Sequence, residues 1–257
     1  MSLRRNALGL CVAVAACATA PADADILIAG APGGGQAWLD DVVAQIFATG
    51  QVPGAIDTFN IQMGTPSLAL LQSYDSVMVF TDFAAQNATL LGDRLADYID
   101  SGGGVVQATF SWHNLIPIAG RWQSGGYSPL TYGSQAQGIE LFLGTRHLPG
   151  HPVLANVVSF SGGTSSYNNT VNVAPGGTAI ADWTNGVPLI AEMTGFNGRI
   201  IGLNFYPPSS DARGDFWRAS TDGDLLLANS MVYVPVPGAL SLLALGGLAM
   251  RRRRRSS

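Results

Sequence analysis

Short apolar runs alternate with amphipathic segments between residues 26 and 110, and this alternation most constrains the fold. Four runs of four or five residues are predicted to be strands: Ile26–Gly30, Ala55–Phe59, Val77–Phe80 and Val105–Thr109. Strands that are separated by helices usually pair in parallel within one sheet. We therefore predict neighbouring strands of a mainly parallel sheet, with apolar side chains buried on both faces.

The segments between these runs have helical patterns. Five apolar residues of the segment 37–48 are spaced to share one helix face: Trp38, Val42, Val43, Ile46 and Phe47. A shorter helix is predicted over 67–74, and another over 90–104, where three glycines end it. This α/β order predicts helices on both faces of the sheet.

The second half of the chain has a different texture. Residues 111–137 are rich in Gly, Ser, Trp and Tyr without a clear period, which indicates a long excursion of loops. Several β-like runs follow, at 171–174, 178–183, 187–193 and 199–206. A last helix over 222–233 is predicted to start at a cap formed by Thr221 or Asp222.

The order of elements resembles the class I glutamine amidotransferase-like fold, in its trehalose-utilisation-type branch. Two stretches carry the resemblance: LADYIDSGGGVVQATF (95–110) and NGRIIGLNFYPP (197–208). It covers most of residues 25–232. The resemblance implies one flavodoxin-like domain with a mainly parallel sheet and helices on both faces.

The resemblance also locates the family's catalytic positions, and this chain departs from all of them. The turn that carries the catalytic Cys reads Phe110-Ser111-Trp112-His113, while Tyr206 stands in place of the His and Pro208 in place of the Glu. A serine nucleophile assisted by His113 is an alternative. The bulky neighbours of Ser111 argue against the sharp turn that such a nucleophile needs.

Residues at the strand ends are the candidate ligand-binding positions, since ligands of open α/β sheets bind there. They are Asp82, Trp112, His113 and Tyr206. Two functions stay open: a non-catalytic module that binds carbohydrate, and a hydrolase of carbohydrate or ester substrates with a non-standard site. Trp112, Trp122, Tyr127 and Tyr132 could stack on sugar rings or, as aromatics more often do, serve packing.

The composition excludes several chemistries. The chain has no lysine, which removes Schiff-base chemistry and the lysine of a phosphate loop. Its only cysteines, Cys11 and Cys17, lie in the N-terminal segment, so thiol catalysis and disulfides are not expected beyond it. Residues 25–250 hold six arginines against sixteen acidic residues, a net charge of −10 that disfavours nucleic acid.

Three weak motifs are better explained without a cofactor or metal. Gly30 and Gly35 have the spacing of a phosphate loop, but Gln36 replaces its lysine. His147 and His151 are separated by Pro149 and Gly150, which break the helix that would pair them on a metal. The Asp222-Gly-Asp224 stretch lacks the remaining ligands of a calcium loop.

The N-terminus has the pattern of a secretory signal peptide over residues 1–24. Arg4 and Arg5 precede an apolar run, and Ala22-Asp23-Ala24 offers small residues to signal peptidase. The stretch that ends at Cys17 also passes as a lipoprotein cleavage box, so lipidation is an alternative. We predict export of the chain.

The C-terminal segment, residues 233–257, has two prolines, an apolar run and an arginine cluster. It resembles the PEP-CTERM sorting signal, with Val236 where the family has Glu. The matching residues are Pro235, Pro237, Gly238, Arg251, Arg252, Arg253, Arg254 and Arg255. The resemblance implies a short transmembrane helix in the inner membrane, recognition by an exosortase, and release to the cell surface or an exopolysaccharide matrix.

Overall fold

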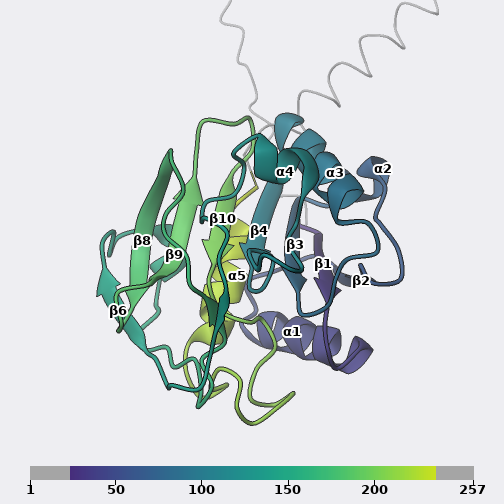
Figure 1. Cartoon of the computed structure of the whole chain (residues 1–257). Coiled ribbons are helices and arrows are strands. Elements are labelled where there is room, and N and C mark those ends of the chain that lie inside the picture. The colour runs from purple at the N-terminus through teal and green to yellow at the C-terminus, as the bar shows by residue number, and fades with distance from the viewer. Residues whose placement is uncertain (1–23, 236–257) are drawn as a thin grey trace, which may run out of the picture.

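The computed structural model describes residues 24–235, which form a sheet covered by helices (Figure 1). Eight strands make the sheet, in the order β2-β1-β3-β4-β10-β9-β8-β6. Their bounds are β1 (Ile26–Ala31), β2 (Ile56–Asn60), β3 (Ser76–Thr81), β4 (Gly104–Ala108), β6 (Leu143–Arg146), β8 (Gly177–Trp183), β9 (Pro188–Met193) and β10 (Ile200–Leu203). Two short strands, β5 (Gln135–Ala136) and β7 (Asn168–Asn169), pair separately.

The first five strands of this order are parallel. β1 pairs with both β2 and β3, β3 with β4, and β4 with β10. The prediction of four neighbouring parallel strands is therefore confirmed, and the order is compatible with a flavodoxin-like fold. The predicted burial of apolar side chains is wrong for β2, where Ile56 and Phe59 are only half-buried, because this strand forms the edge of the sheet.

The other three strands are antiparallel. β9 pairs with β10, β8 with β9 and β6 with β8, all in antiparallel register. The tight turn between β8 and β9 contains Asn185 and Gly186, and Gly186 has a φ of 82° that suits glycine. So short a connection forces its two strands to run in opposite directions. The sheet is thus parallel for most of its width, with an antiparallel extension.

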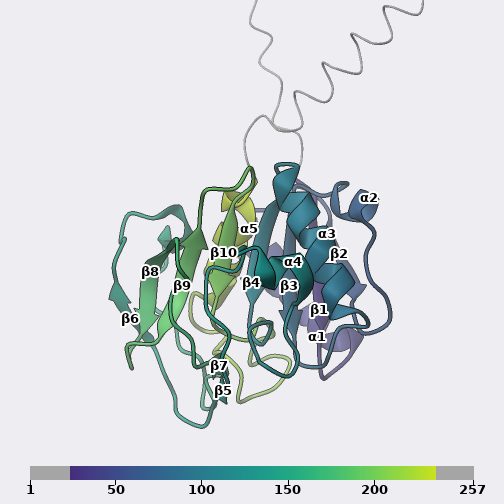
Figure 2. The ribbon, with the colours of Figure 1, turned by 45° about the horizontal axis from the view of Figure 1, so that its top comes forward.

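Helices cover both faces of the sheet, as predicted (Figure 2). α1 (Gln36–Ala48) and α5 (Gly223–Tyr233) pack on one face, where Leu39, Ile46 and Leu227 belong to the larger apolar core. The other face carries α2 (Leu68–Leu71), α3 (Ala88–Asp100) and α4 (Gly120–Ser124) over a second core. A single 3-10 turn, η1 (Pro152–Leu154), contacts α5.

Three local predictions need correction. Phe47 is 73% exposed, because the buried face of α1 is formed by Leu39, Val42 and Ile46. Residues 171–174 form no strand, and Val173 makes only an isolated bridge. Asp222 precedes α5 without capping it through its side chain, since its carboxylate accepts the N–H groups of Val158 and Ser159 instead.

Both ends of the described range lie at the amino-terminal edge of the parallel strands. Val234 packs against Gly104 at the start of β4, and Ala24 against Gly54 just before β2. Within residues 24–235, no helix is long and apolar enough to cross a membrane. The predicted signal peptide and nearly all of the predicted sorting segment lie outside the described residues.

Candidate functional site

Four loops meet at the carboxyl ends of the parallel strands. Gly33 follows β1, Asp82 follows β3, Phe110 follows β4 and Tyr206 follows β10. The strand order reverses between β1 and β3, which is where open α/β sheets bind ligands. The structure thus brings Asp82 and Tyr206 together, as the strand ends predict.

Asp82 and Tyr206 are joined at this edge. The Tyr206 hydroxyl lies 3.4 Å from Oδ2 of Asp82, and the N–H of Gly33 donates to the same oxygen at 3.1 Å. Burial raises the pKa of the Asp82 carboxyl, although the Gly33 hydrogen bond and the charge of Arg213 oppose it. Burial and the charge of Asp82 raise the pKa of Tyr206 well above its ordinary value. Tyr206 therefore stays a proton donor at neutral pH.

An aromatic cluster fills the space around Tyr206. Its ring stacks on Phe110 at 5.6 Å between centroids and meets Phe80 and Phe216 edge-on at 5.7 and 5.1 Å. Trp38, at the start of α1, meets Phe216 edge-on at 4.9 Å. Because these rings pack against one another, little of the Tyr206 ring is open to a ligand, and the residue is only 3% exposed.

Arg213 lies over this cluster. Its guanidinium carbon is 4.2 Å from the ring centroid of Phe216, 5.2 Å from that of Tyr167 and 5.5 Å from that of Trp38. We call these three rings the cage. Arg213 also donates to both carboxylate oxygens of Asp215, at 2.6 and 3.1 Å, and to the Tyr167 hydroxyl at 2.6 Å. Its side chain is still 43% exposed.

The interior beneath the cage is closed. A small void there has no room for a water molecule. Its walls are Gly162, Tyr167, Phe205, Tyr206, Phe216 and Trp217. A ligand at this edge therefore has to bind on the outer surface of the cluster, or move a side chain that covers it.

Of the turn that would carry a nucleophile, Phe110 stacks on Tyr206 at this edge, whereas Ser111 and His113 make no contact that would form a catalytic pair. Ser111 is fully buried, and its hydroxyl donates to the carbonyl of Ala108 at 2.6 Å. His113 is half-buried, and its Nδ1 accepts the N–H of Leu115. Among the described residues, no hydrogen bond joins His113 to Ser111, Asp82 or Tyr206. The serine has no base aligned with it.

Trp112 cannot present a face to a ligand in this structure. The residue is fully buried, packs in a small separate core and donates its indole N–H to Ser128. The aromatic residues that follow it are used in the same way. Trp122 is fully buried, and Tyr132 donates its hydroxyl to the carbonyl of Ile118. The packing interpretation of this excursion is therefore confirmed for Trp112 and Trp122, and a stacking role would need them to move.

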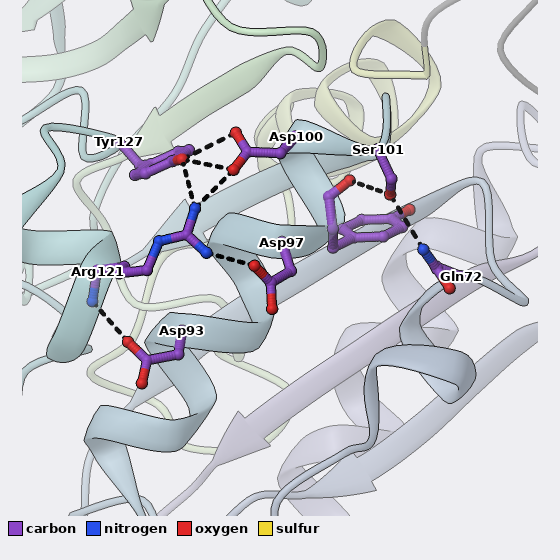
Figure 3. A network of polar contacts seen from close by, with 8 residues as sticks. Gln72, Asp93, Asp97, Asp100, Ser101, Arg121 and Tyr127 are labelled. Carbon is purple, nitrogen blue, oxygen red and sulfur yellow. Dashed lines mark hydrogen bonds and ion pairs between the residues drawn. The ribbon is translucent and has the colours of Figure 1, made fainter.

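Tyr127 belongs to a polar network on the outer surface of α3 (Figure 3). Arg121 of α4 forms ion pairs with Asp97 and Asp100 of α3, and it donates to the Tyr127 hydroxyl at 3.2 Å. The backbone N–H of Arg121 donates to Asp93 as well. These contacts hold α4 on α3 rather than forming a site.

The other two histidines are separated from each other. His147 contacts Asp182 at 2.7 Å, and His151 lies 3.5 Å from Glu192. These carboxylate partners come from β8 and β9, far along the chain, so no local pattern predicts them. Across residues 24–235, no group of three or more His, Cys, Asp or Glu side chains lies close enough to hold a metal ion.

Comparison with known proteins rests on structure alone. No protein-family model and no curated protein matches the sequence. The structure is similar to a ThuA-like protein from Bacteroides uniformis, with a TM-score of 0.58 over 82% of this chain and 94% of the other. The fold is ThuA-like. A second ThuA-like protein, from Parabacteroides merdae, matches 82% of this chain and 89% of its own with a TM-score of 0.55.

Sequence identity to both ThuA-like proteins is 15%, so the likeness concerns the fold. It agrees with the amidotransferase-like domain that the sequence predicts. Chemistry at the carboxyl edge has to be judged from this chain's own side chains. Asp82 and Tyr206 were found from the strand ends, whereas Tyr167, Arg213 and Phe216 come from irregular segments that gave no motif.

Proposed function

We propose that this chain is an exported, non-catalytic ThuA-like module that binds carbohydrate at the carboxyl edge of its sheet. Signal peptidase would release it from the export machinery. An exosortase would then sort it through the inner membrane to the cell surface or an exopolysaccharide matrix. The observation that supports the proposal is the aromatic cluster, which lies where the resemblance would place the catalytic residues and has half-buried rings and carboxylates at its outer surface.

The side chains at the catalytic positions support a non-catalytic role. Amide hydrolysis needs a nucleophile and a base within hydrogen-bond reach of it. Ser111 is buried and bonded to its own turn, and Tyr206 keeps its proton. Neither residue can take the part of the family's Cys or His.

The outer surface of the cluster has the chemistry that sugars need. A sugar ring offers an apolar C–H face and a rim of hydroxyl groups, which suit an aromatic face beside a few fixed polar groups. Trp38 and Tyr167 are half-buried and supply the ring faces. Asp82 and Asp215 supply acceptors next to them.

The position of the chain end supports attachment at a surface. Val234 lies at the amino-terminal edge of the sheet, opposite the aromatic cluster. An anchor that begins after Pro235 would therefore leave the carboxyl edge directed away from the membrane. This geometry suits a module that reaches into surrounding polysaccharide.

Affinity electrophoresis of the full-length chain tests the carbohydrate part. Gels that contain neutral, acidic or amino-sugar polysaccharides should retard the chain in at least one case, and less so after Trp38→Ala. The matched control is Phe47→Ala, which removes an exposed ring of the same helix far from the cluster. Equal mobility in every gel would refute carbohydrate binding.

Cell fractionation tests the sorting part separately. The full-length chain should pass through a membrane-associated stage during export. Replacement of Arg251–Arg255 by alanine should abolish that stage. A chain that never associates with the membrane would show that the C-terminal segment has another role.

A second candidate function is hydrolysis of carbohydrate or ester substrates, favoured by the raised pKa of Asp82 beside Tyr206. A partly buried acid of this kind can act as a proton donor. Glutamine and a panel of glycosides and esters should give no turnover if the module is non-catalytic. Turnover that is lost in Asp82→Asn would establish the enzyme instead, and loss in Ser111→Ala would restore the serine mechanism.

A further inference from the structure

The cage around Arg213 is built to hold a cation. The faces of Trp38, Tyr167 and Phe216 surround the guanidinium at 4.2–5.5 Å. Ring faces carry partial negative charge and attract cations at this distance. The Asp215 carboxylate adds a full negative charge within hydrogen-bond distance.

The carboxylate of this cage does not depend on Arg213 for its position. Ser165 and Tyr167 donate their hydroxyls to Oδ2 of Asp215 at 2.9 and 3.1 Å, and the Asp215 carbonyl accepts the N–H of Ser165. Phe216, the next residue, is buried and packed against Trp38. The rings and the carboxylate therefore stay in place if the arginine leaves.

Arg213, in contrast, is held on an irregular segment with space around it. Arg213 and Gly214 are exposed, and a Cβ added to Gly214 would meet no atom within 4 Å. The chain is fixed on either side of them. Ser209 donates hydrogen bonds from its N–H and hydroxyl to the carboxylate of Asp41 in α1, and Trp217 is buried. The side chain can thus swing outward without disturbing either attachment.

We propose that the cage binds the ammonium-bearing ring of an amino sugar, and that Arg213 occupies the cage until such a unit displaces it. This inference rests on the carbohydrate-binding function proposed above and names its substrate class. The ammonium takes the place of the guanidinium beside Asp215, and the apolar sugar face lies on the rings. The net charge of −10 over residues 25–250 favours the same cationic ligand.

Competition with Arg213 sets the apparent affinity. A tethered occupant leaves only a minor open population, on the order of 0.1–10% for a two-state change of this kind. The apparent affinity falls by the same fraction. Removing Arg213 should therefore strengthen binding of a single short ligand by about tenfold or more.

Binding of two matched oligosaccharides to the full-length chain tests the proposal. A hexamer of β-1,4-linked glucosamine carries ammonium groups, and its N-acetylated counterpart has the same backbone without them. We expect Arg213→Ala to bind the glucosamine hexamer at least tenfold more tightly than the unmodified chain. The acetylated hexamer should not gain, and Asp215→Asn added to Arg213→Ala should abolish the increase.

Arg218→Ala is the matched control. Arg218 lies on the same segment and is equally exposed, but it pairs with Glu140 outside the cage. Its removal changes the net charge by the same amount, so nonspecific attraction of a cationic oligomer would rise equally in both variants. Arg213→Met replaces Arg213→Ala if the alanine variant does not fold.

Quenching of tryptophan fluorescence by acrylamide, a neutral quencher, reports on the cage directly. The other four tryptophans are fully buried, which leaves Trp38 as the accessible one. Quenching should increase in Arg213→Ala but not in Arg218→Ala. Methylguanidinium should reverse that increase by refilling the cage.

The outcomes separate this inference from the proposed function. Equal gains for both hexamers, or equal gains in Arg213→Ala and Arg218→Ala, would overturn the amino-sugar inference and leave carbohydrate binding standing. Methylguanidinium protection without binding of either hexamer would show a cation cage that takes no sugar, which overturns the inference as well. No change in quenching or binding would show that Arg213 covers no site.

Discussion

Arg121 and Arg213 contact the same kinds of side chain, but their ion pairs connect different parts of the fold. Each pairs with aspartate and donates to a tyrosine hydroxyl, and the two side chains are 46% and 43% exposed. Arg121 joins α4 to carboxylates 21 and 24 residues away. Arg213 pairs with Asp215, two residues along its own segment. An ion pair between elements stabilises the fold, whereas a local pair mainly positions its cation.

The surroundings of the two arginines differ as well. Arg121 lies on the outer surface of α3, where its partners are polar (Figure 3). Arg213 lies over three rings that also pack against one another, since Trp38 and Tyr167 each meet Phe216 edge-on. Loss of the first should therefore weaken the fold, and loss of the second should uncover a surface.

The largest loss of stability is expected from replacing Trp122, the apolar side chain that anchors α4. Trp122 is fully buried in the core beneath α3, and its indole N–H donates to Oε1 of Gln107 at 2.9 Å. Trp122→Ala should lower the free energy of unfolding by about 4 kcal/mol, from lost burial, a cavity and an unpaired buried amide oxygen. Urea unfolding measures it. A loss below about 1 kcal/mol would mean that the polar network, not the indole, holds α4.

Removal of either arginine should lower the free energy of unfolding, but by different amounts. Arg121→Ala should lower the free energy of unfolding by about 1 kcal/mol, since exposed ion pairs contribute little each but two converge here. Arg213→Ala should cost less than Arg121→Ala, because Arg213 has one ion pair, within its own segment, and only its hydrogen bond to Tyr167 reaches a distant one. The difference should shrink in 1 M salt, where the screening length falls to about 3 Å. The reverse order of stability would contradict the distinction.

How much of the fold the sequence predicts depends on whether a strand lies inside the sheet or at its edge; the runs predicted at 178–183 and 187–193 match the internal strands β8 and β9. β1, β3 and β4 are largely apolar because both faces of each strand are buried, and this made them visible in the sequence. β2 was located correctly, but its exposure follows from an edge position that no local pattern reveals. β6, which starts at Leu143, is a half-exposed edge strand with an irregular register and has no apolar pattern to detect.

The residues of the candidate site also fall into those that the sequence predicts and those that it does not. Asp82 and Tyr206 directly follow buried parallel strands, so the sheet geometry alone brings them together. Tyr167 and Arg213 lie in irregular segments whose paths are set by long-range hydrogen bonds, such as that from Ser165 to Asp215. No spacing in the sequence encodes those paths. Trp112 looked available for stacking because its burial depends on the same tertiary packing.

The smallest effect concerns Asp82, which lacks the adjacent cation that Asp100 and Asp215 have. Burial raises its pKa, so folding favours the protonated form. The folded state then binds more protons than the unfolded state, and stability falls as pH rises from about 3.9, the ordinary value, through the raised value. Above that window the penalty is constant. The Asp82 carboxyl should therefore lower the free energy of unfolding at neutral pH, where it is ionised, and have no such effect in acid, where it is protonated.

Asp82→Asn removes this penalty while its amide oxygen can still accept the N–H of Gly33. We expect Tm to rise at pH 7, with a gain of at most about 1 kcal/mol because the carboxyl is partly exposed. The gain should vanish near pH 3, where both states of the original carboxyl are protonated. Asp100→Asn is the control, since loss of its ion pair with Arg121 should lower Tm at pH 7. A lower Tm for Asp82→Asn at neutral pH would contradict this prediction and show that the native carboxylate, with its contacts to Gly33 and Tyr206 and the nearby charge of Arg213, stabilises the fold.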